Sequence, residues 1–300
     1  MTTDVRFDSS APYEVEEADV VYARPDGKDL LARVYRPKGT PDAPLIGFVD
    51  VHGGAWNRGD RTVGVHHGRG LAAAGVVVAS VDFRQGPDHK HPAGSADVAA
   101  GVRWMRAHAG RLGIDPRRIG LAGQSSGGHL ALLVALRPGV AAHVGTPIVR
   151  PDGSLDTAPG DDSVAFALVQ YPVADPLARF RYVLARAQEP PQPPPAFDAH
   201  RLVASHHGYF IDEAAMAEAS VTRIASSGQA RALQPVWLAH AELDDNVPTE
   251  ITDAFVSAYG QAGGRIERVF FPGARHGFMQ QPGADTEKCI ALMRDFLGRL

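Results

Sequence analysis

The chain has 300 residues, 44% of them hydrophobic, so its composition allows one large core, and its length is compatible with a single α/β domain. A formal net charge of −4 without a basic stripe argues against a nucleic-acid-binding protein. No run of about 18 apolar residues occurs, and the first twenty residues lack a basic region followed by an apolar one; we therefore expect no membrane span and no secretory signal, and we predict a cytoplasmic location.

Strand-like and helical patterns alternate along most of the chain. Two strand-like runs are joined by Asp26-Gly27, which predicts an N-terminal hairpin. Further on, continuous apolar runs typical of buried parallel strands alternate with stretches of helical spacing. We therefore predict an α/β fold in which residues 1–300 form a single domain, with a mostly parallel sheet of about eight strands and helices on both faces. The strands are predicted at 16–25, 28–37, 44–54, 76–83, 118–124, 163–172, 232–243 and 265–273.

One long segment interrupts this alternation, between a strand that ends near Tyr171 and another that begins near Pro235. Its proline-rich stretch QEPPQPPPAF, at 188–197, favours extended backbone. Excursions of this length from a regular sheet are typical of lids and binding insertions. We predict a lid or cap at about 173–232; the alternative is an exposed embellishment with no role at a site.

Chemically reactive side chains follow several of the predicted strands. The segments are HGGAW at 52–56, GQSSG at 123–127, AELDDNVP at 241–248 and PGARHGF at 272–278. In an open parallel sheet, ligands bind beyond the carboxyl ends of the strands. A serine, an acid and a histidine are therefore expected at one edge of the sheet, in the chain order Ser, Asp, His.

The GQSSG segment matches the G-x-S-x-G turn on which a nucleophilic serine is presented. Ser125 is expected at the tip of a strained strand-to-helix turn. Gly123 and Gly127 would remove the Cβ atoms that clash in such a turn. The helix that follows would direct its N-terminal N–H groups toward negative charge at the site.

A serine hydroxyl is a weak nucleophile and needs a base to accept its proton. We predict that His276 is this base and that a carboxylate orients its ring. Asp244 and Asp245 are both candidates, and we prefer Asp244 because of its position relative to Val247-Pro248 in the turn.

The remaining candidates concern the oxyanion and the substrate. Backbone N–H groups of Gly53 and Gly54, together with that of Ser126, are predicted to form an oxyanion hole. The chain has 13 histidines, but none is paired with cysteine or carboxylate at zinc-ligand spacing, so we predict neither a metal nor a cofactor. Candidate substrate contacts are Trp56, for which core packing is the alternative, Tyr209 and Phe210.

These motifs resemble the esterase/lipase branch of the α/β-hydrolase superfamily that carries an HGG oxyanion loop, including the hormone-sensitive-lipase-like and feruloyl-esterase-like groups. The resemblance extends from about Val20 to the C-terminus, apart from the insertion, and rests on HGGAW, DFRQGPDHKHPAGSADVAAGVRWM, DPRRIGLAGQSSGGHLALL, HAELDDNVP and ARHGF. The turn that contains Ser125 reads GQSSGG where the hormone-sensitive-lipase-like group usually has GDSAGG. The resemblance implies hydrolysis of small or medium carboxylic esters without a cofactor, through an acyl-enzyme on Ser125.

Two other functions remain open at this point. The same three side chains can hydrolyse an amide or formamide, as in an arylformamidase, and the sequence does not separate this from ester hydrolysis. A non-catalytic ligand-binding homologue is a third interpretation. In the enzymatic interpretations the partner is a small-molecule substrate; the oligomeric state cannot be read from the sequence.

Overall fold

The computed structural model describes residues 4–190 and 197–300. These residues form a ten-stranded sheet and a separate pair of two-residue strands. The pair consists of β1 (Asp4–Val5) and β4 (Thr40–Pro41). From one edge of the large sheet to the other, the strands are β12 (Ile266–Phe271), β11 (Val236–Ala241), β10 (Ala167–Gln170), β7 (Ile114–Gln124), β5 (Leu45–Val51), β6 (Val76–Val81), β3 (Leu30–Pro37), β2 (Val15–Ala23), β8 (Ile148–Val149) and β9 (Leu155–Asp156).

The strands from β12 to β6 are parallel, and this parallel part carries the reactive segments. Strand β3 runs antiparallel to β6 and pairs with β2 in the hairpin that Asp26-Gly27 predicts. The eight longer strands lie where the sequence predicts them, whereas the two-residue strands β8 and β9 extend the edge unpredicted. The predicted α/β class with a mostly parallel sheet is confirmed.

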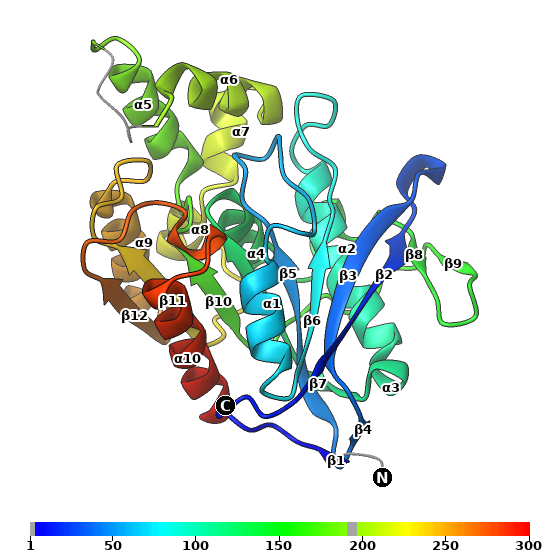
Figure 1. The fold of residues 1–300 in the computed structure, drawn as a ribbon. Helices are drawn as coiled ribbons and strands as arrows, with labels where there is room; N and C mark the ends of the chain where they lie inside the picture. Colours follow the sequence, from blue (N-terminus) through cyan, green and yellow to red (C-terminus); the bar gives the residue numbers. More distant parts are fainter. Residues whose placement is uncertain (1–3, 191–196) are drawn as a thin grey trace.

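Helices cover both faces of the sheet (Figure 1), and each face has its own apolar core. Helices α1 (Val65–Ala72) and α10 (Ala284–Gly298) pack on one face. On the other face lie α2 (Ala93–Ala107), α3 (Ala109–Leu112), α4 (Ser126–Leu136) and α9 (Thr249–Gln261). Within the described residues, no helix is both long and apolar enough to cross a membrane.

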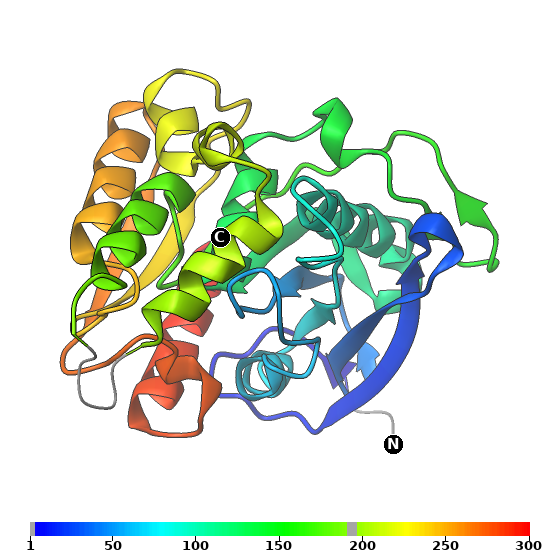
Figure 2. The same ribbon diagram turned by 90° about the horizontal axis from the view of Figure 1, so that it is seen from above.

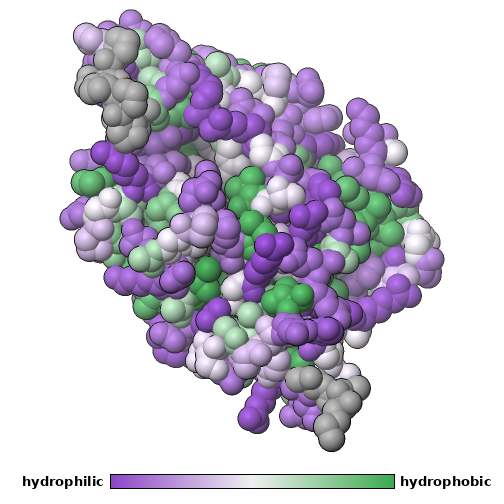
Figure 3. Space-filling view, viewed as in Figure 1, coloured by the Kyte–Doolittle hydropathy of each residue, from purple (hydrophilic) through white to green (hydrophobic). Residues whose placement is uncertain are grey.

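Polar side chains cover most of the face seen in Figure 3, with apolar residues dispersed among them. The large apolar side chains that remain exposed, such as Leu155, Ile211 and Phe270, belong to different elements of the fold. Single exposed apolar residues of this kind are normal on a folded protein.

The described residues of the interrupting segment form four helices between β10 and β11, at the carboxyl end of the parallel strands (Figures 1 and 2). Each begins at an aspartate or serine whose side chain accepts a hydrogen bond from an N–H of the first turn, which is why the helices start where they do. The proline-rich residues 191–196 lie outside the described residues. The helices are α5 (Pro176–Arg186), α6 (Ala199–Tyr209), α7 (Glu213–Glu218) and α8 (Val221–Ser226).

Candidate active site

Ser125 lies between the end of β7 and the start of α4, with φ 53° and ψ −119°. A positive φ is costly for a residue with a side chain, by about 1–3 kcal/mol. The flanking glycines make the turn feasible: a Cβ on Gly123 would lie 2.5 Å from the Gly127 carbonyl oxygen, and one on Gly127 would lie 2.1 Å from that of Val51. The sharp turn inferred from GQSSG is present, and it leaves the Ser125 side chain only 6% exposed.

Three side chains from distant parts of the chain meet at this turn. The Nε2 atom of His276 lies 2.8 Å from Ser125 Oγ, and its Nδ1 atom lies 2.8 Å from Asp244 Oδ2. The loops after β7, β11 and β12 carry the three residues, so the convergence follows from the parallel order of these strands. With Nδ1–H donating to the carboxylate, Nε2 is free to accept the serine proton.

The two adjacent aspartates differ in their surroundings. The Asp244 side chain is 3% exposed, and its other oxygen accepts hydrogen bonds from the backbone N–H groups of Asn246, at 2.9 Å, and Val247, at 2.8 Å. Asp245 is 40% exposed and has only a distant cation, Arg275 at 3.8 Å. The geometry therefore favours Asp244 as the carboxylate that orients the histidine.

The HGGAW loop lies directly against the serine turn. A Cβ on Gly53 would lie 3.1 Å from the Gln124 carbonyl oxygen, and Gly54 has a φ of 125°. Within the described residues, the N–H groups of Gly53 and Gly54 donate to no carbonyl or side chain. Ser126 is the first residue of α4, so its N–H has no acceptor within the helix. These three N–H groups are therefore free to donate hydrogen bonds to an oxyanion.

His52 braces this loop through a ring contact and a hydrogen bond. Its ring is 2% exposed, stacks on Phe83 with centroids 4.5 Å apart, and donates Nδ1–H to the Gly53 carbonyl oxygen at 2.7 Å. Burial lowers the pKa of His52, although the hydrogen bond to Gly53 acts in the opposite direction, and the lowered pKa favours the neutral ring.

The three aromatic residues predicted to contact substrate lie in the core instead. Trp56 and Tyr209 are fully buried and Phe210 is 1% exposed. The Trp56 ring stacks on Tyr209, with centroids 5.8 Å apart, and meets Phe210 edge-on at 5.1 Å. None of the three lines the cavity at Ser125. The prediction fails because Tyr209 and Phe210 stand at the end of α6, where they pack into the core rather than line the cavity beside Ser125.

A cavity of about 300 Å³ opens beside Ser125. Residues of the HGGAW loop, His276 and side chains of α5 and α6 line it. From the segment between β10 and β11, the side chains that reach it are Arg179, Arg201 and Leu202, and sequence reasoning missed all three. Nothing in their local sequence separates these two arginines from the rest of the chain's 30 basic residues.

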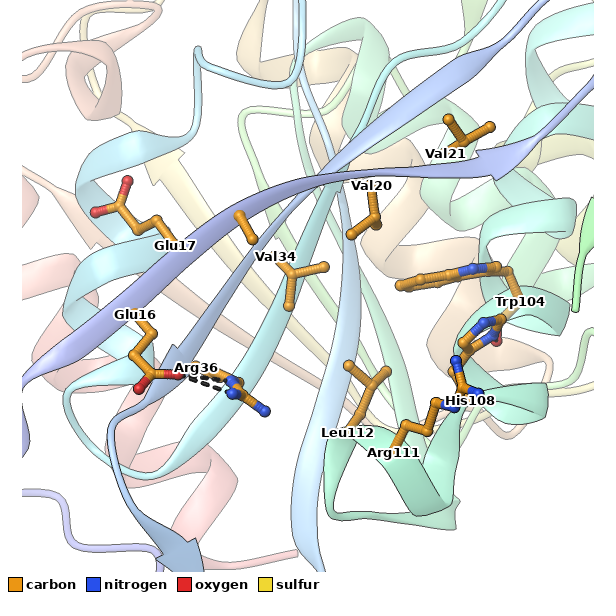
Figure 4. A pocket seen from close by; sticks show the side chains of 11 residues that line it. Glu16, Glu17, Val20, Val21, Val34, Arg36, Trp104, His108, Arg111 and Leu112 are labelled. Carbon is orange, nitrogen blue, oxygen red and sulfur yellow. Dashed lines mark hydrogen bonds and ion pairs between the residues drawn. The ribbon is translucent and has the colours of Figure 1, made fainter. Parts of the chain in front are cut away.

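A second cavity, of about 540 Å³, is larger but lacks a nucleophile (Figure 4). It lies between β2 and β3 on one side and α2 and α3 on the other, toward the amino end of β7. Its histidine, His108, donates Nδ1–H to the Trp104 carbonyl oxygen of its own helix. Across residues 4–190 and 197–300, no cluster of histidine, cysteine and acidic side chains could hold a metal ion.

The family model for the alpha/beta hydrolase fold matches residues 48–280, a range that includes all three hydrogen-bonded side chains. The protein belongs to the alpha/beta hydrolase family. The family expected from the motifs is thereby confirmed.

Several esterases are similar to this alpha/beta hydrolase. Carboxylesterase NlhH of Mycobacterium tuberculosis is 39% identical over 137 residues, which are 44% of this chain and 40% of NlhH. Esterase LipC of the same organism is 31% identical over 284 residues, which are 92% of this chain and 63% of LipC. The chain therefore matches less than two thirds of the length of these curated relatives. A solved structure of a propionate-bound esterase from Thermogutta terrifontis is 26% identical with a TM-score of 0.70, covering 96% of this chain and 94% of that one.

Proposed function

We propose that the protein is a serine carboxylesterase that hydrolyses small or medium carboxylic esters through an acyl-enzyme on Ser125. The observation that carries this proposal is the pair of 2.8 Å hydrogen bonds that join Ser125 to His276 and His276 to Asp244. The similarity to NlhH, LipC and the T. terrifontis esterase supports ester hydrolysis as the activity.

The first half-reaction forms the acyl-enzyme. His276 Nε2 takes the hydroxyl proton as Ser125 Oγ attacks the ester carbonyl, and Asp244 stabilises the imidazolium that results. The N–H groups of Gly53, Gly54 and Ser126 hold the negative oxygen of the tetrahedral intermediate. The imidazolium then gives its proton to the leaving alkoxide, and the alcohol departs.

The second half-reaction releases the acid. A water molecule gives a proton to His276 and attacks the acyl carbonyl, and the same N–H groups stabilise the second oxyanion. When the intermediate collapses, Ser125 Oγ leaves and recovers the proton from His276. These reaction steps require no cofactor.

Substrate size and the cap belong to the same proposal. A cavity of about 300 Å³ is at the small end of the range for ligand sites. The T. terrifontis esterase has been solved with propionate and with butyrate bound, which supports a short acyl group here. We propose that residues 173–232 act as the cap over this cavity, since α5 and α6 supply part of its wall. The cytoplasmic location remains a prediction.

Labelling with a fluorophosphonate probe tests the nucleophile. The wild-type protein should be labelled, and Ser125→Ala should abolish both labelling and p-nitrophenyl butyrate hydrolysis, with kcat reduced at least about 10³-fold. Ser227→Ala, at an exposed serine of the cap segment, serves as the control. A folded wild-type protein that is never labelled would favour the non-catalytic interpretation. Comparison with butyryl p-nitroanilide separates ester from amide hydrolysis.

A further inference from the structure

Two arginines from the cap line the cavity beside Ser125. Arg179 is on α5 and Arg201 is on α6, and these two helices pack against each other. A third arginine, Arg58, reaches the same cavity from the oxyanion loop and is exposed. No aspartate or glutamate is among the cavity's described lining residues. The described lining of the cavity therefore carries an excess of positive charge.

The positive charge of these arginines is not neutralised within the described part of the protein. Arg179 is 1% exposed and donates hydrogen bonds to the side-chain and backbone oxygens of Asn246, but its Nη1 has no partner. The Arg201 guanidinium makes no hydrogen bond to described residues, and its Nη1 is buried. Neither arginine has a described carboxylate within 4.0 Å of it, whereas Asp244 is occupied by His276 and two backbone N–H groups.

A buried cation without a counter-ion is unfavourable unless a ligand supplies the missing charge. Burial lowers the pKa of Arg179 to about 9, although Asp244 acts in the opposite direction, so the guanidinium stays protonated at neutral pH. Burial and the nearby Arg58 lower the pKa of Arg201 as well, although Asp198 acts in the opposite direction. Guanidinium groups with free N–H donors are suited to a planar anion, above all a carboxylate.

We infer that the cavity binds esters that also carry a carboxylate, with Arg179 and Arg201 holding the carboxylate while the ester carbonyl meets Ser125. This inference rests on the proposed esterase function and specifies its substrate class. Hydrolysis of such an ester consumes one water molecule and yields a second acid and an alcohol. The carboxylate can belong to the acyl part, giving a dicarboxylate product, or to the alcohol part, giving a hydroxy acid.

A purely structural role explains Arg179 in part and Arg201 not at all. The bonds from Arg179 to Asn246 brace the turn that carries Asp244, so a variant of Arg179 would disturb the acid as well as the cavity. Arg201 has no such bonds to described side chains, which makes it the informative position. Arg181, on the same helix as Arg179, is 66% exposed and paired with Glu213, and provides a matched control.

The kinetic test compares esters of equal shape and different charge. One pair is monoethyl glutarate and its neutral amide, ethyl 4-carbamoylbutanoate; the other is 4-acetoxybutanoate and 4-acetoxybutanamide, with the charge in the alcohol part. In at least one pair we expect kcat/KM for the anionic ester to exceed that for the amide by about tenfold or more. Arg201→Gln should reduce this ratio at least about fivefold, because it removes one charge-assisted contact to the carboxylate. Arg181→Gln should leave the ratio unchanged.

Failure of the inference and failure of the esterase function give different results. If the neutral esters are hydrolysed but neither pair shows a preference for the anion, the inference is overturned and the esterase function stands. If no ester is hydrolysed, calorimetric titration of Ser125→Ala protein with monoethyl glutarate and with its amide decides the matter. Binding of the anion alone, lost on adding Arg201→Gln, supports the anion site; equal or absent binding of both compounds refutes it.

Discussion

Asp244 and Asp245 carry the same functional group one residue apart, and the fold gives them different surroundings. Asp244 is almost fully buried and receives hydrogen bonds from His276 and from two backbone N–H groups of its own turn. Asp245 points to solvent, near Arg275. A carboxylate held in place before the reaction can stabilise an imidazolium as it forms, whereas an exposed one is screened by water.

Asp244→Asn should therefore be far more damaging than Asp245→Asn. An amide at position 244 favours the wrong histidine tautomer, and we expect kcat for p-nitrophenyl butyrate to fall roughly 10⁴-fold. The exposed Asp245 contributes little, and its variant should stay within about threefold of the wild type. Steady-state kinetics on both variants measures the difference; a ranking in the opposite order would assign the role to Asp245.

At the scale of elements, the loop 52–64 between β5 and α1 joins the serine turn to the cap. The Trp56 N–H donates to Ser126 Oγ at 3.2 Å, and its indole N–H donates to His129 Nδ1 at 3.1 Å. Its ring stacks on Tyr209 of α6. The aromatic cluster thus holds the oxyanion loop against both α4 and α6, which explains why these rings are buried rather than available to substrate.

Gly54→Ala tests how strictly this loop is positioned. The new Cβ would lie 1.9 Å from the Arg58 carbonyl oxygen, and alanine is strained at a φ of 125°, so the loop has to move. We expect kcat to fall about 10²–10³-fold, as for loss of one oxyanion donor. Gly145→Ala, where a Cβ meets nothing within 4 Å, is the control. If the Gly54 variant kept the kcat of the wild type, this loop would not be part of the oxyanion hole.

At the scale of the whole molecule, several histidines are buried, and one of them, His129, connects helix α4 to Ala219 after α7. His129 on α4 accepts from Trp56 at Nδ1 and donates Nε2–H to the Ala219 carbonyl oxygen at 2.9 Å, a pattern that only the neutral ring can make. Burial lowers its pKa, and that of His206, to about 3, and that of His143 to about 4.

These histidines make stability depend on pH in one direction. Below the ordinary histidine pKa of 6.5 the unfolded chain binds protons that the folded protein does not, until the pH approaches the folded values of about 3 to 4. The contribution of these histidines to stability is therefore complete well above pH 6.5 and is lost as the pH decreases toward the folded values. Each histidine contributes up to about 1.4 kcal/mol per pH unit to the slope.

His129→Gln should reduce the pH dependence of the free energy of unfolding by the equivalent of about one bound proton. Glutamine can keep both hydrogen bonds without titrating. Urea unfolding of the wild type and the variant at several values between pH 7.5 and pH 5 measures the slope. His66→Gln, at a partly exposed position on α1, is the control. Parallel pH dependences for the wild type and His129→Gln would show that His129 titrates normally in the folded protein.

The sequence by itself determined the sheet and the placement of the reactive residues. Alternating apolar runs and helical spacing specify parallel strands, and parallel strands bring their carboxyl ends to one edge, so residues after β7, β11 and β12 have to lie close together. The glycines around Ser125 were equally readable, because a backbone with positive φ and close neighbours leaves no room for a Cβ. Both inferences depend on local chain geometry.

Only the tertiary structure decided which cap residues face the serine. The sequence favoured the aromatic Tyr209 and Phe210, yet the polar Arg179 and Arg201 line the cavity while the aromatic rings are buried. The side of a short helix that faces a cavity depends on how the helix packs on the rest of the fold. The sequence of the helix does not by itself specify that orientation. Large apolar rings gain most by leaving water, so they take the core, and the wall of the site is left to the arginines.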